Sequence, residues 1–134
     1  IDSTLELVDI IKSSVPVKYF IDNHPERQIF QALRIEVNSE LKVLESVLPD
    51  AINLLNKGGR LCVITFHSLE DRIVKKIFKK YSEVDEKVKG LPYIPDEYKP
   101  LISIVNNKPL IAKENEIEEN SRSKSAKLRI IERI

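Results

Sequence analysis

The chain has 134 residues, of which 42% are hydrophobic and 32% charged, and its formal net charge is +1 at pH 7. This length predicts one domain or part of one, with enough apolar residues for a core. No apolar run approaches the roughly 20 residues that a membrane-spanning helix needs. The small net charge indicates no partner by itself.

The reactive residue types are few. The single cysteine, Cys62, excludes an internal disulfide and fits a reducing cytoplasm. The two histidines, His24 and His67, have no cysteine close to either, so no metal site is expected. The absence of methionine, together with a helical pattern at the first residues, predicts a fragment of a longer protein.

The first part of the chain is predicted to be helical. A capped helix over residues 5–14 precedes a short connector over residues 17–24. In residues 25–55, apolar side chains recur every three or four positions, which predicts one long amphipathic helix. Pro49 is expected to break or kink that helix near Val47.

A buried strand is predicted at residues 60–66. Gly58 and Gly59 come just before it and suit the turn that ends the preceding helix. The strand is apolar and rich in β-branched residues, a pattern typical of a strand buried on both faces of a mostly parallel sheet. Cys62 is then expected to be a small core residue.

A dense polar cluster follows this strand and opens a helix predicted over residues 68–82. It contains His67, Ser68, Glu70, Asp71 and Arg72. Ligands of open α/β sheets bind at the carboxyl ends of strands, so part of this cluster is a candidate site. The alternative is an ordinary helix start, in which Ser68 is the N-cap, Asp71 is the acid of a capping box, and Asp71 pairs with Lys75.

The remainder of the chain predicts a small amount of further sheet. Residues 83–100 form a loop with one helical turn, and short strands are predicted at residues 101–105 and 110–112. A helical turn over residues 114–119 and a basic, serine-rich loop over residues 121–125 lead to the last elements. The alternating residues 126–134 predict a final strand.

Basic residues gather in two places, which suggests phosphate contacts, although solubility alone is the alternative. The clusters are Arg72, Lys75, Lys76, Lys79 and Lys80, and then Arg122, Lys124, Lys127 and Arg129. Arg34 and Asn38 interrupt the amphipathic pattern of residues 25–55 and are either plain surface or functional.

Three longer stretches carry a family resemblance. They are FQALRIEVNSEL at residues 30–41, FHSLEDRIVK at residues 66–75 and NSRSKSAKLR at residues 120–129. In this order and spacing, they resemble the bacterial family that methylates the exocyclic N(4) amine of a cytosine in 16S ribosomal RNA. The resemblance covers nearly the whole chain.

That resemblance implies an α/β fold: the distal half of a Rossmann-like class I methyltransferase sheet, with about three strands and flanking helices. The strand order is expected to be 60–66, 127–134, 101–112, with the last strand antiparallel in the middle. Residues 1–24 would be the tail of an inserted helical substrate-recognition domain, and residues 25–134 the C-terminal half of the methyltransferase domain. The cofactor implied is S-adenosyl-L-methionine, bound mainly by a missing N-terminal half.

The resemblance also implies roles for named residues. A catalytic pocket rim would contain His67, Ser68, Glu70 and Asp71, while RNA contacts or loop bracing would come from Arg34, Asn38, Arg72, Arg122 and Lys124. The implied partner is the 16S rRNA of the small ribosomal subunit, with no membrane.

If the chain is a fragment, two consequences are expected. The fragment alone is expected to be inactive, and the bare edge of its first strand is expected to pair with a second chain, for example as a dimer. Two alternatives remain open: a non-catalytic RNA-binding module that uses the two basic patches, and an unrelated doubly wound enzyme.

Overall fold

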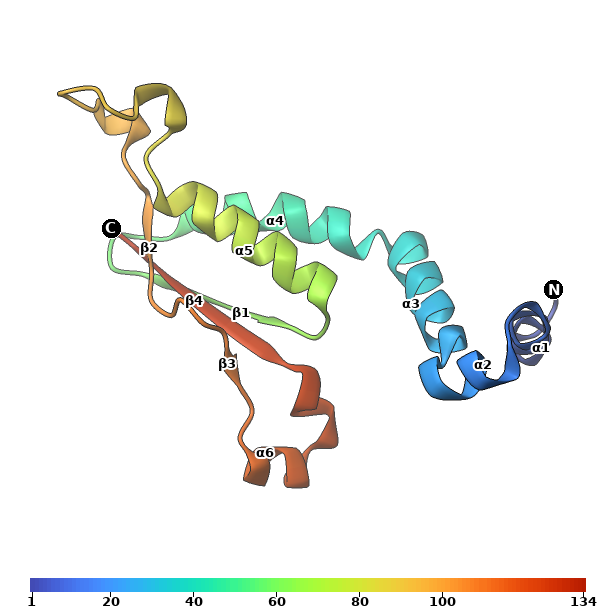
Figure 1. Cartoon of the computed structure of the whole chain (residues 1–134). Coiled ribbons are helices and arrows are strands. Elements are labelled where there is room, and N and C mark those ends of the chain that lie inside the picture. Colours follow the sequence, from blue (N-terminus) through green and yellow to red (C-terminus); the bar gives the residue numbers. More distant parts are fainter. The chain divides into compact units, whose positions relative to one another are not determined.

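The computed structural model describes all 134 residues and divides them into two compact units, Ile1–Glu40 and Leu41–Ile134. The second unit contains a four-stranded sheet and its flanking helices, which confirms the expected mixed α/β class (Figure 1). None of the helices has both the length and the apolar character needed to cross a membrane.

The first unit is made of helices. They are α1 (Thr4–Ser14), α2 (Val17–Asn23) and α3 (Pro25–Asn38). Residues 17–24 were predicted to be a short connector, but they contain the helix α2. His24, in the left-handed conformation with φ 48°, joins α2 to α3, and Pro25 takes the first position of α3, where its missing N–H costs nothing.

The long helix predicted over residues 25–55 is two helices, α3 and α4 (Glu40–Leu54), so that prediction was wrong. The break is at Ser39, whose φ is 51°. Pro49 neither breaks nor ends α4. Leu48 and Ile52, on either side of it, are buried in the core, and we attribute the continuous helix to this packing.

The sheet lies in the second unit. Its strands are β1 (Arg60–Thr65), β2 (Ile102–Ile104), β3 (Leu110–Ile111) and β4 (Lys127–Arg133). The order is β1-β4-β2, β3 also pairs with β4, and every pairing is antiparallel. This confirms the predicted order with the last strand in the middle. Because β2 and β3 both pair with β4, the strand expected over residues 101–112 is one interrupted strand.

Two helices cover one face of this sheet. They are α4 and α5 (Ser68–Ser82), whose buried side chains pack in one cluster against β2 and β4 (Figure 1). The buried core lies between them and the strands, and its residues are Leu48, Ile52, Val74, Phe78, Ile102 and Ile131. The end of α5 near residues 80–82 agrees with the sequence pattern.

The opposite face of the sheet has no cover within this chain. Leu61 and Val63 point toward the core, whereas Cys62 and Ile64 are exposed, Ile64 by 58%. The predictions of a strand buried on both faces and of a core Cys62 were therefore wrong for this chain. The apolar run predicted two covered faces, and α4 and α5 supply the cover for only one of them.

The connections contain short helical turns. The loop over residues 83–100 has two of them, η1 (Glu86–Val88) and η2 (Asp96–Tyr98), where one was predicted. Between β3 and β4 lie α6 (Glu114–Glu119), as predicted, and the 3-10 turn η3 (Ser121–Ser125).

Candidate functional site

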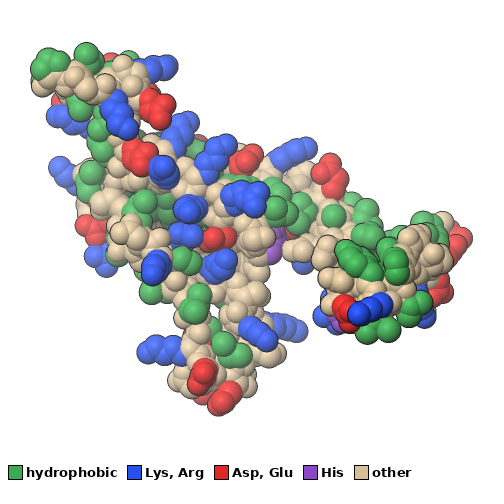
Figure 2. Space-filling model, in the orientation of Figure 1, with side chains coloured by type: hydrophobic (Ala, Val, Ile, Leu, Met, Phe, Trp, Pro, Cys, Tyr) green, Lys and Arg blue, Asp and Glu red, His purple; other side chains and the backbone are tan.

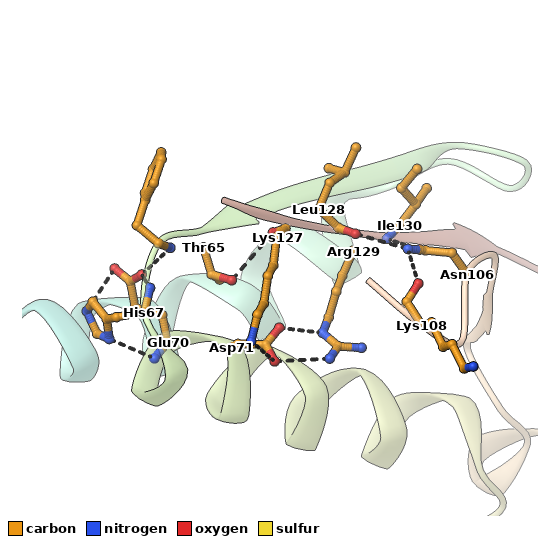
Figure 3. A network of polar contacts seen from close by, with 11 residues as sticks. Thr65, His67, Glu70, Asp71, Asn106, Lys108, Lys127, Leu128, Arg129 and Ile130 are labelled. Carbon is orange, nitrogen blue, oxygen red and sulfur yellow. Dashed lines mark hydrogen bonds and ion pairs between the residues drawn. The ribbon is translucent and has the colours of Figure 1, made fainter. Parts of the chain in front are cut away.

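The polar cluster after β1 forms a tightly bonded turn into α5. The Oε2 atom of Glu70 accepts hydrogen bonds from the backbone N–H groups of Phe66, at 2.8 Å, and His67, at 3.3 Å. In return, the Nδ1 atom of His67 accepts the backbone N–H of Glu70 at 3.4 Å. This reciprocal arrangement is a capping box. Figure 3 shows both side chains turned toward each other at the start of the helix.

The cap was assigned to the wrong residues by sequence reasoning. His67, not Ser68, is the N-cap, and the acid of the capping box is Glu70, not Asp71. Ser68 is the first residue of α5 and is exposed. A histidine is an unusual cap, and serine is a common one, so local preference alone favoured Ser68.

The imidazole of His67 is held in one orientation. Because Nδ1 accepts a backbone N–H, the proton of a neutral ring lies on Nε2, which is 3.4 Å from Oε1 of Glu70. The side chains of His67 and Glu70 are 13% and 22% exposed. The two residues thus close the turn through the capping box, while Nε2 is buried without a hydrogen-bond partner.

Asp71 lies one residue further along α5 and binds the last strand. Its Oδ1 and Oδ2 atoms accept hydrogen bonds from Nε and Nη2 of Arg129 at 2.7 Å and 3.1 Å, and Nζ of Lys127 lies 3.9 Å from Oδ2 (Figure 3). The hydrogen bond from Arg129 lowers the pKa of Asp71, an effect that burial partly opposes. Lys75, the predicted partner, makes the smallest contribution to that lowering.

Sequence reasoning named Arg129 only as part of a basic cluster and missed this ion pair. Arg129 is 8% exposed and shares the core-facing side of β4 with Ile131, which is fully buried. The signal was available in the alternation of residues 127–131, because a charged residue on a buried face needs a partner of opposite charge. The pairing of β4 with β1 could not be used to find the partner, since Asp71 lies on a helix.

A second polar residue anchors the edge of the sheet. Asn106 lies between β2 and β3, where residues 105–109 face only Arg129 and Ile130 of β4. Its Oδ1 accepts the N–H of Ile130 at 2.7 Å, and its Nδ2 donates to the carbonyl of Leu128 at 3.0 Å. The side chain therefore replaces the backbone pairing that the interruption removes (Figure 3).

The residues expected to contact RNA have two kinds of environment. Arg72, Arg122 and Lys124 are exposed in the second unit. Arg34 and Asn38 belong to the first unit, where both donate to the Glu40 carboxylate, Arg34 through two hydrogen bonds of 3.0 Å and 3.2 Å. Both residues therefore bind an acid of their own unit.

Positive charge is concentrated over one helix. Lys and Arg side chains gather where Figure 1 places α5, and Figure 2 shows few acidic side chains among them. The exposed cations of α5 are Arg72, Lys75, Lys76, Lys79 and Lys80. This surface suits contact with an anionic polymer.

Taken together, the turn offers a wall of internally bonded side chains and not a free base. The carboxylates of Glu70 and Asp71 are both bound inside the chain, so neither is poised to accept a proton from a substrate. The wall leaves Ser68, Leu69, Arg72 and the ring of Phe66 accessible. Such a wall can position a substrate that other residues hold from the opposite side.

A mixed α/β unit with a polar cluster at the carboxyl end of β1 is compatible with a fragment of a class I methyltransferase, and comparison with known families agrees. The model of the MraW methylase family matches residues 1–134. The chain therefore belongs to the MraW methylase family.

Several curated relatives are similar over the whole chain, and each is called ribosomal RNA small subunit methyltransferase H. The protein from Lactobacillus acidophilus is 54% identical over 133 residues, which are 98% of this chain and 42% of the relative. The protein from Lactobacillus helveticus is 53% identical with the same coverage. That from Lactobacillus delbrueckii subsp. bulgaricus is 53% identical over 135 residues, 43% of its length. The chain thus spans less than half the length of these relatives.

Proposed function

We propose that this chain is the distal part of an S-adenosylmethionine-dependent methyltransferase that modifies the N(4) amine of a cytosine in 16S rRNA. The observation that carries the proposal is the identity of 53–54% with relatives named small subunit rRNA methyltransferases, over at least 98% of the chain. The rRNA target follows from those names, and the cytosine amine follows from the resemblance of residues 30–41, 66–75 and 120–129 to the family.

We infer that this chain contributes little to holding the cofactor. The glycine pair Gly58 and Gly59 precedes β1 instead of following it, so it is not placed to hold a nucleotide at a strand end. The polar groups after β1 are bound to one another. We therefore assign cofactor binding, and with it the supply of the methyl group, mainly to residues outside this chain. The chain alone is expected to be inactive.

Within the proposed enzyme, this chain contributes positioning. The amine of cytosine is a weak nucleophile, because its lone pair is delocalised into the ring, so alignment of the base is the main task. The base must leave its stack to reach a pocket. We place His67, Ser68, Glu70 and Asp71 at the rim of that pocket. Arg34, Asn38, Arg72, Arg122 and Lys124 are assigned to the RNA backbone or to bracing of the loops.

The proposal also covers the domain organisation of the chain and the cellular location of the protein. Residues 1–24 are assigned to the tail of an inserted helical domain, and residues 25–134 to the methyltransferase domain. The second edge of β1 is unpaired within this chain, and we propose that a strand of the complete polypeptide pairs with it; a dimer through this edge is the alternative. A cytoplasmic location is proposed from the single cysteine and the rRNA substrate.

The role of His67 is tested by substitutions that separate chemistry from capping. His67→Asn keeps an effective N-cap but removes the imidazole, whereas His67→Ala removes both. In the complete enzyme, we expect methyl transfer to small-subunit rRNA to fall at least about tenfold in both variants, with the thermal midpoint lowered mainly in His67→Ala. Full activity of a folded His67→Asn would remove His67 from the pocket rim and leave it a cap.

Cofactor binding tests the proposal as a whole. Calorimetry of the complete protein with S-adenosylmethionine is expected to show binding, whereas the 134-residue chain is expected to show none. RNA binding without cofactor binding by the complete protein would favour the alternative, a non-catalytic RNA-binding module.

A further inference from the structure

A small hollow opens beside α5, away from the turn that contains His67. Its volume is about 220 Å³, and it lies between α5, the interruption of the edge strand and β4. The polar residues in its lining include Lys75, Lys79, Glu83, Asn106, Asn107 and Arg129. None of these residues belongs to the proposed pocket rim.

The charges around this hollow favour an anion. Lys75 and Lys79 lie one helical turn apart and are exposed, and Lys75 forms no salt bridge of its own. The one acid in the lining, Glu83, lies 3.9 Å from Lys79 across two exposed side chains, a weak pair in water. Arg129 is neutralised by Asp71 and forms the inner wall. The two lysines therefore leave a net positive charge at the opening.

The hydrogen-bonding groups and the volume of the hollow limit the class of ligand further. Asn106 is held by Ile130 and Leu128, so the amide open to a ligand is that of the exposed Asn107. The hollow is smaller than the roughly 300–1,000 Å³ of small-molecule sites, yet it has room for several waters of about 30 Å³ each. A phosphate group with its bridging waters fits this volume.

We propose that this hollow is a docking point for a backbone phosphate of the RNA substrate, held by Lys75, Lys79 and Asn107. The inference rests on the proposed function for the identity of the RNA, but it concerns a site separate from the reaction. Because phosphate contacts position RNA without reading its sequence, the site anchors the molecule while the target base is placed elsewhere. The surrounding cations of α5 attract the backbone toward it.

The test compares two pairs of lysines on the same helix. Lys75→Gln with Lys79→Gln removes the two cations of the hollow. Lys76→Gln with Lys80→Gln removes the same charge at the same spacing outside it. Binding of a fluorescently labelled fragment of 16S rRNA to the complete protein is measured by anisotropy at several salt concentrations.

If the hollow binds a phosphate, the two pairs of substitutions should weaken RNA binding by different amounts. We expect the first pair to weaken binding about tenfold and to reduce the slope of log affinity against log salt by about 1, since each phosphate contact contributes roughly 0.7–0.9 to that slope. The second pair is expected to weaken binding no more than about threefold. Equal losses in the two pairs would overturn the proposal, because a diffuse positive field does not distinguish them.

Two further variants complete the design. Asn107→Ala changes no charge and is expected to weaken binding about threefold, whereas a general attraction predicts no change. Lys75→Arg with Lys79→Arg keeps the charge and is expected to restore most of the affinity. The anisotropy assay measures RNA binding and not methyl transfer. A negative result for the hollow therefore does not contradict the proposed reaction. The proposed reaction is tested separately, by assaying methyl transfer with the unsubstituted complete protein.

Discussion

The carboxylate of Asp71 is held between two cations of the last strand, and this contact ties α5 to β4. The side chains of Asp71 and Arg129 are only 14% and 10% exposed. A buried ion pair of this kind stabilises little relative to a well-packed apolar pair, but removing one partner leaves a buried charge without compensation. Asp71 therefore has a structural role beside the pocket-rim role proposed for it.

This structural role predicts a measurable penalty. We expect Asp71→Ala to lower the free energy of unfolding of the complete protein by about 3 kcal/mol, because Arg129 is left buried and unpaired. Asp71→Ala combined with Arg129→Met is expected to recover part of this loss, since no charge is then buried. Urea unfolding measures both variants, and a double variant less stable than Asp71→Ala alone would contradict the buried ion pair.

The same contact predicts a direction with pH. The hydrogen bond from Arg129 lowers the pKa of Asp71 in the folded protein, so its contribution to stability is complete above the unfolded pKa of about 3.9. The contribution is lost as the pH falls below that value through the lowered folded pKa. The difference in unfolding free energy between the unsubstituted protein and Asp71→Asn should be constant near neutrality and shrink below about pH 4. A difference that grows on acidification would contradict this assignment.

At the scale of elements, helix ends and strand interruptions depend on single side chains. Gly58, with φ +80°, makes the turn from α4 into β1, and its N–H donates to the carbonyl of Arg133 at 2.8 Å. A Cβ on Gly59 would lie 2.8 Å from the carbonyl oxygen of Asn56, so this second glycine is required by close approach. The glycine pair predicted the turn correctly, because both constraints are local.

The interrupted edge strand depends in a similar way on one side chain, that of Asn106. Asn106→Ala leaves the part-buried N–H of Ile130 without an acceptor, and we expect it to cost about 2 kcal/mol of unfolding free energy. The neighbouring Asn107 is exposed, so Asn107→Ala is a matched control with an expected effect near zero on stability. Equal stability of the two variants in thermal or urea unfolding would show that the Asn106 hydrogen bonds do not hold the interrupted strand.

Predictions at this scale succeeded where neighbouring residues decide the outcome. The bounds of α5 and α6 were confirmed, since helical periodicity acts over a few residues. The strand order was also confirmed, but its prediction came from the family resemblance. The break at Ser39 was missed. It is stabilised by hydrogen bonds from Arg34 and Asn38 to the carboxylate of Glu40, and the spacing of apolar residues carries no information about such polar contacts.

At the scale of the whole molecule, one face of the sheet is apolar and lacks cover within the chain. Ile64, Leu128 and Leu110 are paired across β1, β4 and β3, and so point to the same face. Ile64 is 58% and Leu110 53% exposed. Together with the unpaired edge of β1, this row fits the proposal that further polypeptide completes the sheet.

This face predicts the behaviour of the isolated chain. The 134 residues alone are expected to self-associate in sedimentation velocity, because an exposed apolar face and a bare strand edge both favour pairing. Ile64→Lys with Leu110→Lys is expected to shift the distribution toward monomer. A stable, monodisperse monomer of the unsubstituted chain would count against the incomplete sheet.

The family of the chain and most of its elements were determined by the sequence alone, because motifs, turns and periodicities involve residues that are close together. Tertiary structure decided what the polar residues are bonded to. The alternation of residues 127–133 predicts two faces of β4, but only packing against α5 buries the face that contains Arg129 and gives that residue Asp71 as its partner. Likewise, the cluster after β1 predicts a site, whereas its closure by His67 and Glu70 depends on how β1 meets α5. Contacts between residues that are distant in sequence are selected by burial, which is a property of the folded chain.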